Sequence, residues 1–442
     1  MTLQNDINDH FNLYQFVFRL PFLKYVHVTC HRSEIRFSFS IPPNEQFTRL
    51  EHLILNHRCS VSELFTLFSS TPFLRRVTCE HLYGPSSTST KLILSNLRSM
   101  SFGHCHLDFD GFETFMTCLS ANLQCLRVTT TENSTYLDAH RWEQFFSKFF
   151  PSLHQFYFRS EEKIRHRFML RSHYHHLHQF TSHFWIERQW LLEILIDATS
   201  EFSASIVFQI EPWKAKKRWH QVYEHIRQEK FSQTCSTQWL SDIPYATNIH
   251  LILNQRTNQA FEKPQDNHLL IYKFESIFSL VPVTHLEVTF RRMFLQTLLR
   301  LLGQLPNLHS LKLSCQLLLQ MDCLSDQDKE MIQLVKMNNR ISSISLMELT
   351  EFQQIQFLLD LFPYLEYLQI DLTKQIDFEH FLQAILKRNP QDPSRFSALC
   401  LYVNQDNDQV IEQLRTIIDQ HRLLNTYLLQ RLDKDNLYLR WN

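Results

Sequence analysis

Histidines gather in one short segment, where their spacing could bind a metal ion. The segment contains His173, His175, His176 and His178. Zinc takes imidazole or thiolate ligands that converge in tetrahedral geometry. His173 and His175 have the spacing that a strand would need, but no cysteine lies close to them in sequence. We therefore expect a polar surface loop here and no bound metal. His104 and His106 are a weaker candidate, because Cys105 between them has a structural explanation given below.

The acidic residues also offer little chemistry. Asp108 and Asp110 form an Asp-x-Asp pair, as in metal-dependent sugar transferases, but they directly precede a helical pattern and are better explained as helix caps. No Ser/His/Asp or Cys/His set stands out from the 24 histidines. We expect a protein that is not an enzyme and that has no cofactor.

Glycine scarcity excludes further classes of enzyme. The chain has 442 residues and only 4 glycines. Phosphate-binding loops need several glycines at short spacing, because their backbone must approach the phosphate closely. No such spacing occurs here, and the Gly-x-Ser-x-Gly motif of many hydrolases is also absent. Most nucleotide-dependent and hydrolase functions are therefore not expected.

The balance of basic and acidic residues indicates whether a nucleic-acid partner is expected. Lys214, Lys216, Lys217 and Arg218 lie between Trp213 and Trp219, and such a basic and aromatic cluster could bind single-stranded nucleic acid. However, the net charge is −1, whereas nucleic-acid-binding proteins normally have a basic excess. We expect a solvated turn and do not expect a nucleic-acid partner.

The cysteines and the apolar segments indicate a compartment. The ten cysteines include no Cys-x-x-Cys pair, and Met1–His10 does not resemble a signal peptide. This pattern favours reduced thiols in the cytoplasm or the nucleus. No apolar run approaches the roughly 18 residues of a membrane span, so we expect no membrane partner.

A strand-like pattern, L-x-x-L-x-L, recurs along the chain. Its first anchors are Leu23, Leu50, Leu74, Leu97, Leu123 and Leu153, separated by 27, 24, 23, 26 and 30 residues. It resumes with anchors at Ala246, Val283, Leu308, Ile341, Leu365 and Phe396. Leucine-rich repeats have a period of roughly 20–29 residues. Cys105 falls at the position where such repeats use Asn or Cys to bond the backbone.

Helical spacing alternates with this strand pattern. Apolar residues at a period of about 3.6 predict helices over 112–119, 142–149, 352–362 and 378–385. Asp108 or Asp110, Asp138 and Asp377 are at the positions of their N-caps. The sequence therefore predicts an α/β fold, an irregular leucine-rich-repeat solenoid with the shape of a horseshoe.

The repeat stops between residues 160 and 240, a segment rich in aromatic residues and histidine. Within it, 191–196 and 205–210 have the composition of two strands of a β-hairpin. We expect N-terminal repeats over 1–159, an insertion packed on the solenoid over 160–240, and C-terminal repeats over 241–442.

The residues between the leucines of each strand should line the concave face, since strand side chains alternate between faces. Concave repeat surfaces commonly bind other proteins, and Tyr and Arg are enriched at interfaces. The candidate protein-binding residues are Tyr25, His27, Arg76, Arg127, Tyr157, Arg159, His250, His285, Lys312 and Tyr367.

Several segments resemble a known family. They are T-P-F-L-R-R-V-T-C at 71–79, T-Y-L-D-A-H-R-W-E-Q-F-F at 135–146, F-T-S-H-F-W-I-E-R-Q-W at 180–190 and F-Q-I-E-P-W-K-A-K-K-R-W at 208–219. The chain resembles F-box-like leucine-rich-repeat proteins that are expanded in some small invertebrates. The resemblance implies an N-terminal F-box that docks the adaptor of a cullin-based ubiquitin ligase. Only 22 residues precede Leu23, and Met1–Phe18 contains no Leu-Pro start, so we expect the F-box to be missing here.

Two functions follow from these observations. The first is a non-catalytic scaffold whose concave face binds an unknown protein ligand. The alternative is the substrate-recognition part of an F-box-type cullin ubiquitin ligase receptor whose F-box is lost or truncated; the ligase adaptor is then a partner only if an F-box is encoded upstream. A metal-dependent enzyme built on the histidine segment ranks third.

Overall fold

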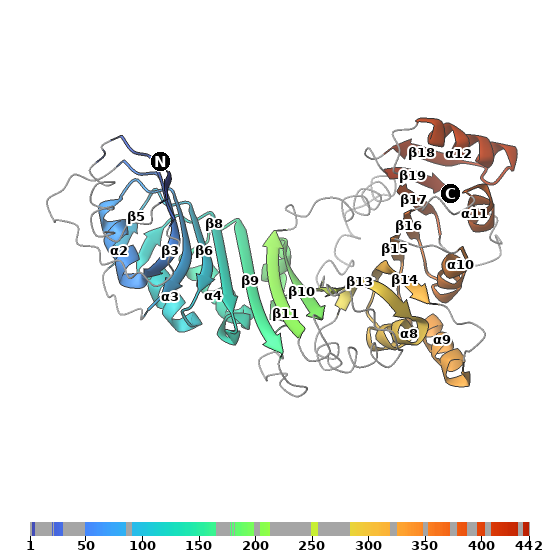
Figure 1. The fold of residues 1–442 in the computed structure, drawn as a ribbon, viewed down its shortest axis with the longest axis horizontal. Coiled ribbons are helices and arrows are strands. Elements are labelled where there is room, and N and C mark those ends of the chain that lie inside the picture. Colours follow the sequence, from blue (N-terminus) through green and yellow to red (C-terminus); the bar gives the residue numbers. More distant parts are fainter. Residues whose placement is uncertain are drawn as a thin grey trace. The chain divides into compact units, whose positions relative to one another are not determined.

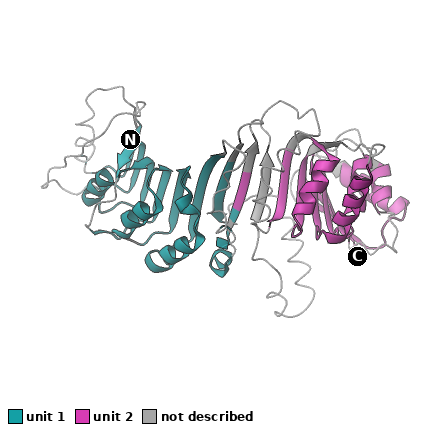
Figure 2. Cartoon of the chain, turned by 90° about the horizontal axis from the view of Figure 1, so that it is seen from below, with its two compact units in different colours: residues 1–163, 171–192, 206–215 teal, residues 164–170, 193–205, 216–442 magenta. Residues whose placement is uncertain are grey.

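The structure is a computed structural model in which two compact units are distinguished (Figure 2). Unit 1 comprises residues 1–163, 171–192 and 206–215, and unit 2 comprises 164–170, 193–205 and 216–442. The described residues are 2–4, 20, 22–29, 49–84, 91–164, 177, 179–180, 182–198, 204–212, 249–254, 283–318, 325–347, 352–371, 378–386, 396–402, 408–431 and 436–441. The histidine segment at 173–176 and 178 and the basic cluster at 214–218 lie outside them.

Unit 1 contains parallel strands that pair in chain order (Figure 1). They are β2 (Tyr25–Thr29), β3 (His52–Ser60), β4 (Arg76–Tyr83), β6 (Ser99–Cys105), β8 (Cys125–Thr131) and β9 (Gln155–Ile164). The short β1 (Thr2–Gln4) adds to β2, and β5 (Leu92–Leu94) pairs separately with β7 (Leu119–Ala121). The pairing aligns equivalent repeat positions, for example Leu53 with Val77 and Val77 with Met100.

Helices connect these strands, and two of them lie where the spacing predicts a helix. They are α2 (Val61–Ser70), α3 (Phe109–Thr117), the 3-10 turn η2 (Ser134–Leu137), α4 (Ala139–Phe149) and the short α5 (His183–Glu187). Asp108, and not Asp110, caps α3, because its Oδ1 accepts a hydrogen bond from the Gly111 N–H at 2.8 Å. Asp138 caps α4 through the Arg141 N–H at 3.1 Å. The predicted helices over 112–119 and 142–149 are confirmed, and each begins three residues earlier than predicted.

Aromatic side chains fill the space between helices and strands in unit 1. Trp142 is fully buried, with ring centroids 4.7 Å from Phe109 on α3 and 4.8 Å from Phe156 on β9. Aromatic pairs at such distances add to the free energy gained from apolar burial. The high phenylalanine content of the chain therefore serves a core built at the contact between successive repeats.

Two strands occur where the sequence predicts a hairpin, β10 (Trp190–Ala198) and β11 (Ala204–Pro212). β11 pairs with β9, and β10 pairs in parallel with β12 (Ile249–Asn254), so both are members of the sheets. The physical reason is that a sheet edge leaves backbone groups unpaired, and edge pairing satisfies them. The division into 1–159, 160–240 and 241–442 stays a prediction.

Unit 2 repeats the parallel arrangement. After β12 come β13 (Val283–Phe294), β14 (Ser310–Leu318), β15 (Ser343–Met347), β16 (Tyr367–Asp371) and β17 (Ala398–Tyr402). The final strands are antiparallel, with β19 (Asn436–Trp441) between β17 and β18 (Tyr427–Arg431). The helices are α8 (Leu295–Gln304), α9 (Asp326–Asn338), α10 (Phe352–Leu361), α11 (Phe378–Leu386) and α12 (Asp408–Gln420). Helices α10 and α11 confirm two predictions; the expected cap Asp377 lies outside the described residues.

The apolar anchors of the repeat form the core of each unit. Among the copies whose side chains are described, the second and third positions of L-x-x-L-x-L are buried throughout, such as Leu126 and Val128 or Leu368 and Ile370. The chain is thus a mixed α/β protein of parallel strands that alternate with helices. None of the helices formed by the described residues is both long enough and apolar enough to cross a membrane.

Candidate binding surface on the sheet of unit 1

The outward residues of the unit 1 strands form a surface that we call the polar sheet face. It consists of two rows that the strand register aligns across six strands. One row is Tyr25, His52, Arg76, Ser99, Cys125 and Gln155, and the other is His27, Ile54, Thr78, Ser101, Arg127 and Tyr157. Every one of these side chains is half-buried or exposed. The face arises because polar residues alternate with buried anchors along each strand.

Arg127 and Tyr157 are the best-positioned pair on this face. The Arg127 guanidinium lies over the Tyr157 ring, 4.5 Å from its centroid, and Arg127 itself is exposed. A guanidinium stacked on an aromatic ring keeps its N–H donors free to bind carboxylates. Further along β9, Arg159 donates to Gln209 at 3.4 Å and lies 3.9 Å from Glu161. Its charge is therefore partly satisfied within the molecule.

The N-terminal end of the face is organised by hydrogen bonds. The Nε2 atom of His27 lies 2.9 Å from the Asn56 amide nitrogen and 3.2 Å from the Thr29 hydroxyl. Tyr25 and His52 pack with ring centroids 6.4 Å apart. The strand register thus places Tyr25, His27, Arg76, Arg127 and Tyr157 on one face of the sheet, and their role in protein binding stays a prediction.

The predicted residues of unit 2 have different surroundings. The Lys312 ammonium is 2.7 Å from the Glu287 carboxylate, and both side chains are less than one-fifth exposed. His285 is half-buried, with its Nδ1 atom 2.9 Å from the Thr284 hydroxyl. His250 lies in β12, with its side chain outside the described residues.

Tyr367 is not a surface residue, and its inclusion among exposed binding residues is wrong. It is only 3% exposed and clusters with Ala398, Cys400 and Tyr438. Residues on both faces of β16 are buried, so the outward position of this strand belongs to a core. Tyr438 comes from the antiparallel β19, and sequence periodicity within the repeats does not reveal that such a strand will pair there.

A group of titratable side chains lies next to the polar sheet face, at the ends of β4 and β6. The rings of His81 and His104 stack at 4.7 Å, and His106 lies 6.0 Å from His81. The Glu80 carboxylate is 3.9 Å from the His104 Nε2 atom. Burial lowers the pKa of His81 and of His106, and the neighbouring His104 lowers both further. We call Glu80, His81, His104 and His106 the histidine cluster.

Sequence reasoning considered His104 and His106 but missed their partners. His81 follows the anchor Leu74 by seven residues, and His104 follows Leu97 by the same interval. Residues at equivalent positions of successive repeats lie side by side once the strands pair, as the His81–His104 register shows. Comparing equivalent positions, and not only neighbours in sequence, would have found the pair.

Cys105 has the structural role that its repeat position suggests. The thiol is buried, lies 3.4 Å from the Tyr136 hydroxyl, and is hydrogen-bonded by the backbone of Leu107. Burial raises the pKa of the Cys105 thiol to about 11, although the hydrogen bonds with Tyr136 and Leu107 act in the opposite direction. A thiol with so high a pKa is a poor nucleophile and a poor metal ligand at neutral pH.

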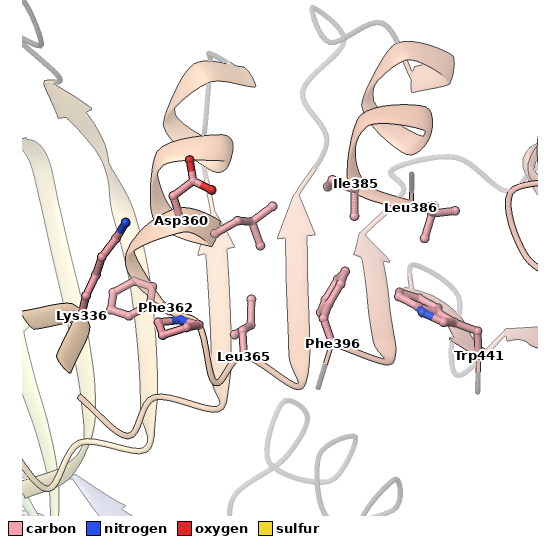
Figure 3. A pocket seen from close by; sticks show the side chains of 10 residues that line it. Lys336, Asp360, Phe362, Leu365, Ile385, Leu386, Phe396 and Trp441 are labelled. Carbon is pink, nitrogen blue, oxygen red and sulfur yellow. The ribbon is translucent and has the colours of Figure 1, made fainter. Parts of the chain in front are cut away.

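Unit 2 contains a cavity of about 310 Å³ near the start of β16 and β17 (Figure 3). Leu365, Phe396 and Trp441 contribute apolar walls, and the last two rings meet edge to face at 5.1 Å. Lys336 and Asp360 also line it. Sequence analysis did not predict this cavity.

No protein-family model matches the chain, and no curated protein matches it. Among solved structures, the chain is similar to one chain of the structure described as "Crystal structure of TLR13-ssRNA13 complex". The sequences are 12% identical, the TM-score is 0.26, and the match covers 80% of this chain and 40% of the other. The chain therefore spans less than half the length of that protein, and a likeness this low supports neither a function nor a partner. The comparisons give no support to the F-box resemblance.

Proposed function

We propose that the chain is an irregular leucine-rich-repeat solenoid that works as a non-catalytic protein-binding scaffold. The repeat interval, the parallel strands paired in chain order and the buried anchors support the solenoid. In such proteins each repeat contributes outward residues to an extended binding face. The polar sheet face of unit 1 is the binding surface in this proposal.

The observation that carries the proposal is the Arg127–Tyr157 stack. Ordering a long, charged side chain on binding normally costs conformational entropy. The ring holds the Arg127 guanidinium in place before a ligand arrives. Arg76, on the same face, is also exposed. Two exposed arginines, of which Arg127 is stacked on an aromatic ring, favour a protein segment with acidic side chains, which a planar guanidinium can bind with two hydrogen bonds.

Affinity capture with the full chain tests this proposal. We expect the double variant Arg76→Glu/Arg127→Glu to lose acidic partners that the wild-type chain retains, because the reversed charges repel them. Captured proteins are identified by mass spectrometry, and the dissociation constant of the purified partner is then measured. We expect it to rise by more than about 100-fold in the double variant.

A matched control reverses two exposed lysines outside the polar sheet face, Lys91 and Lys148. The Lys91→Glu/Lys148→Glu variant should bind like the wild type. An unchanged partner list and affinity for the Arg76→Glu/Arg127→Glu variant would overturn the proposed binding face. Capture of a cullin adaptor would instead support the alternative role as a ligase substrate receptor.

A further inference from the structure

The histidine cluster has the composition of a metal site. Glu80, His81 and His104 each offer one ligand atom, and these three atoms lie within 4.8 Å of one another. All three side chains are half-buried; Glu80 and His81 lie on β4, and His104 on the adjacent β6 pairs in register with His81. The third imidazole, His106, has its ring centroid 6.5 Å from that of His104.

We propose that Glu80, His81 and His104 bind a divalent transition-metal ion of the zinc class. Imidazole nitrogen and carboxylate oxygen are ligands that Zn²⁺ accepts, with four ligands in structural sites. His106 or a water molecule supplies the fourth. This site is separate from the protein-binding residues of the proposed function and does not depend on them.

The backbone around the site leaves room for the carboxylate. Gly103 lies beside Glu80, and a Cβ atom added at Gly103 would come within 2.7 Å of the Glu80 carboxylate. A larger residue at 103 would therefore displace the proposed oxygen ligand. The chain has only 4 glycines, and this one stands where the carboxylate of the neighbouring strand needs the space.

Charge favours a divalent cation over an anion at this place. The site combines one carboxylate with neutral-form ligands of the imidazole type, and imidazole and carboxylate groups are ligands of cations and not of anions. The positive charge of Arg58, on the neighbouring strand β3, disfavours a cation at this site. Arg58 pairs in register with His81, while its guanidinium lies over the Tyr83 ring at 5.1 Å. Removing the Arg58 charge should therefore strengthen metal binding.

Zinc titration of the purified full chain, in competition with a chromophoric chelator, is the first test. We expect the His81→Ala/His104→Ala variant to lose one equivalent of bound Zn²⁺, with affinity at that site falling by more than about 100-fold. The control variant His154→Ala/His183→Ala removes two exposed histidines and should keep wild-type stoichiometry. Because the equivalents are compared between variants, any zinc bound by the histidines at 173–178 does not obscure the result.

Two single variants should change the zinc affinity of the site in opposite directions. Gly103→Ala should weaken binding by about 10- to 100-fold, because it moves Glu80. Arg58→Gln should strengthen it by about 2- to 10-fold, because a nearby positive charge is removed. A loss of folding would not raise affinity, so the second variant separates a metal site from a structural effect. Unchanged affinity in both variants overturns the proposed site.

A second measurement needs no substitution. Diethyl pyrocarbonate modifies accessible histidines of the wild-type chain, and peptide mass spectrometry reports the rate at each residue. One equivalent of Zn²⁺ should slow modification of His81 and His104 by about tenfold and leave the exposed His154 unaffected. Equal rates with and without Zn²⁺ at His81 and His104, together with wild-type zinc stoichiometry in the double variant, contradict the proposal.

Discussion

Two tyrosines at the same position of the repeat show how far the surroundings of single residues differ. Tyr25 comes two residues after Leu23, and Tyr367 comes two residues after Leu365. Tyr25 is 41% exposed on the polar sheet face, whereas Tyr367 is 3% exposed in a cluster with Tyr438. The repeat position therefore fixes which face of the strand a side chain occupies, but not whether that face is open.

Alanine substitution distinguishes these two environments. We expect Tyr367→Ala to lower the free energy of unfolding by about 3–5 kcal/mol, because it leaves a cavity among buried side chains. Tyr25→Ala should cost less than about 1 kcal/mol, as is usual for exposed positions. Urea unfolding followed by circular dichroism measures both. Equal costs would show that the two tyrosines do not differ in burial as described.

At the scale of elements, helix starts and strand starts are fixed by short polar contacts. Asp108 caps α3 and Asp138 caps α4. Strand starts are joined by ion pairs, since the Glu51 carboxylate lies 2.9 Å from the Lys24 ammonium and 3.5 Å from Arg75 Nε. These three residues hold the same position in successive repeats. Polar residues at repeat boundaries thus align neighbouring copies while the apolar anchors supply the core.

The cap of α3 can be tested by a pair of substitutions at one position. Asp108→Ala should lower the free energy of unfolding by about 1 kcal/mol, because the Gly111 N–H loses its acceptor. Asp108→Asn should cost only a few tenths of a kcal/mol, since Asn is an equally good N-cap. Thermal unfolding of both variants checks this. Similar losses in the two variants would mean that the cap is not the stabilising contact.

The Glu51 contacts predict a pH dependence. The hydrogen bond from Lys24 is the main cause of the lowered pKa of Glu51, which burial partly offsets and Arg75 lowers further. A carboxyl whose folded pKa is below its unfolded value of about 4.5 stabilises the fold above that pH and loses this effect as the pH falls through the folded pKa. We therefore expect Glu51→Gln to lower the melting temperature at pH 7, with an effect that becomes smaller as the pH falls below 4.5.

The control for this prediction is Glu330→Gln, which replaces an exposed carboxylate on α9. Its melting temperature should follow that of the wild type at each pH. A Glu51→Gln difference that persists unchanged at low pH would show that the stabilisation does not come from the charged carboxylate.

At the scale of the whole molecule, positive and negative charges are nearly equal in number but unevenly distributed over the surface. The net charge is −1, so long-range attraction of an acidic partner is weak. The polar sheet face nevertheless presents Arg76 and Arg127, while in unit 2 the strands β15, β16 and β17 are buried on both faces. Binding on unit 1 should therefore depend on close-range contacts with its arginines.

Salt dependence tests this at the same scale. Raising ionic strength from about 0.05 to 0.5 M should weaken binding of the captured acidic partner, since salt screens exposed charges within about 10 Å at 0.1 M. The Arg76→Gln/Arg127→Gln variant should bind more weakly and show a smaller salt effect. A salt effect of the same size in this variant would place the ionic contacts elsewhere.

The sequence by itself determined the repeat, the α/β class and the identity of most buried anchors. Those features depend on local spacing, because apolar residues at period 2 or 3.6 favour a strand or a helix wherever the segment lies. It also predicted that Tyr25, His27, Arg76, Arg127 and Tyr157 share one face, because strand side chains alternate.

Only the tertiary structure decided how distant segments meet. It buried Tyr367 against Tyr438, joined β10 and β11 to the sheets, and brought His81 next to His104. The physical reason is that these outcomes depend on the pairing register of strands far apart in sequence and on what covers each face. The spacing of residues within one repeat carries no information about either.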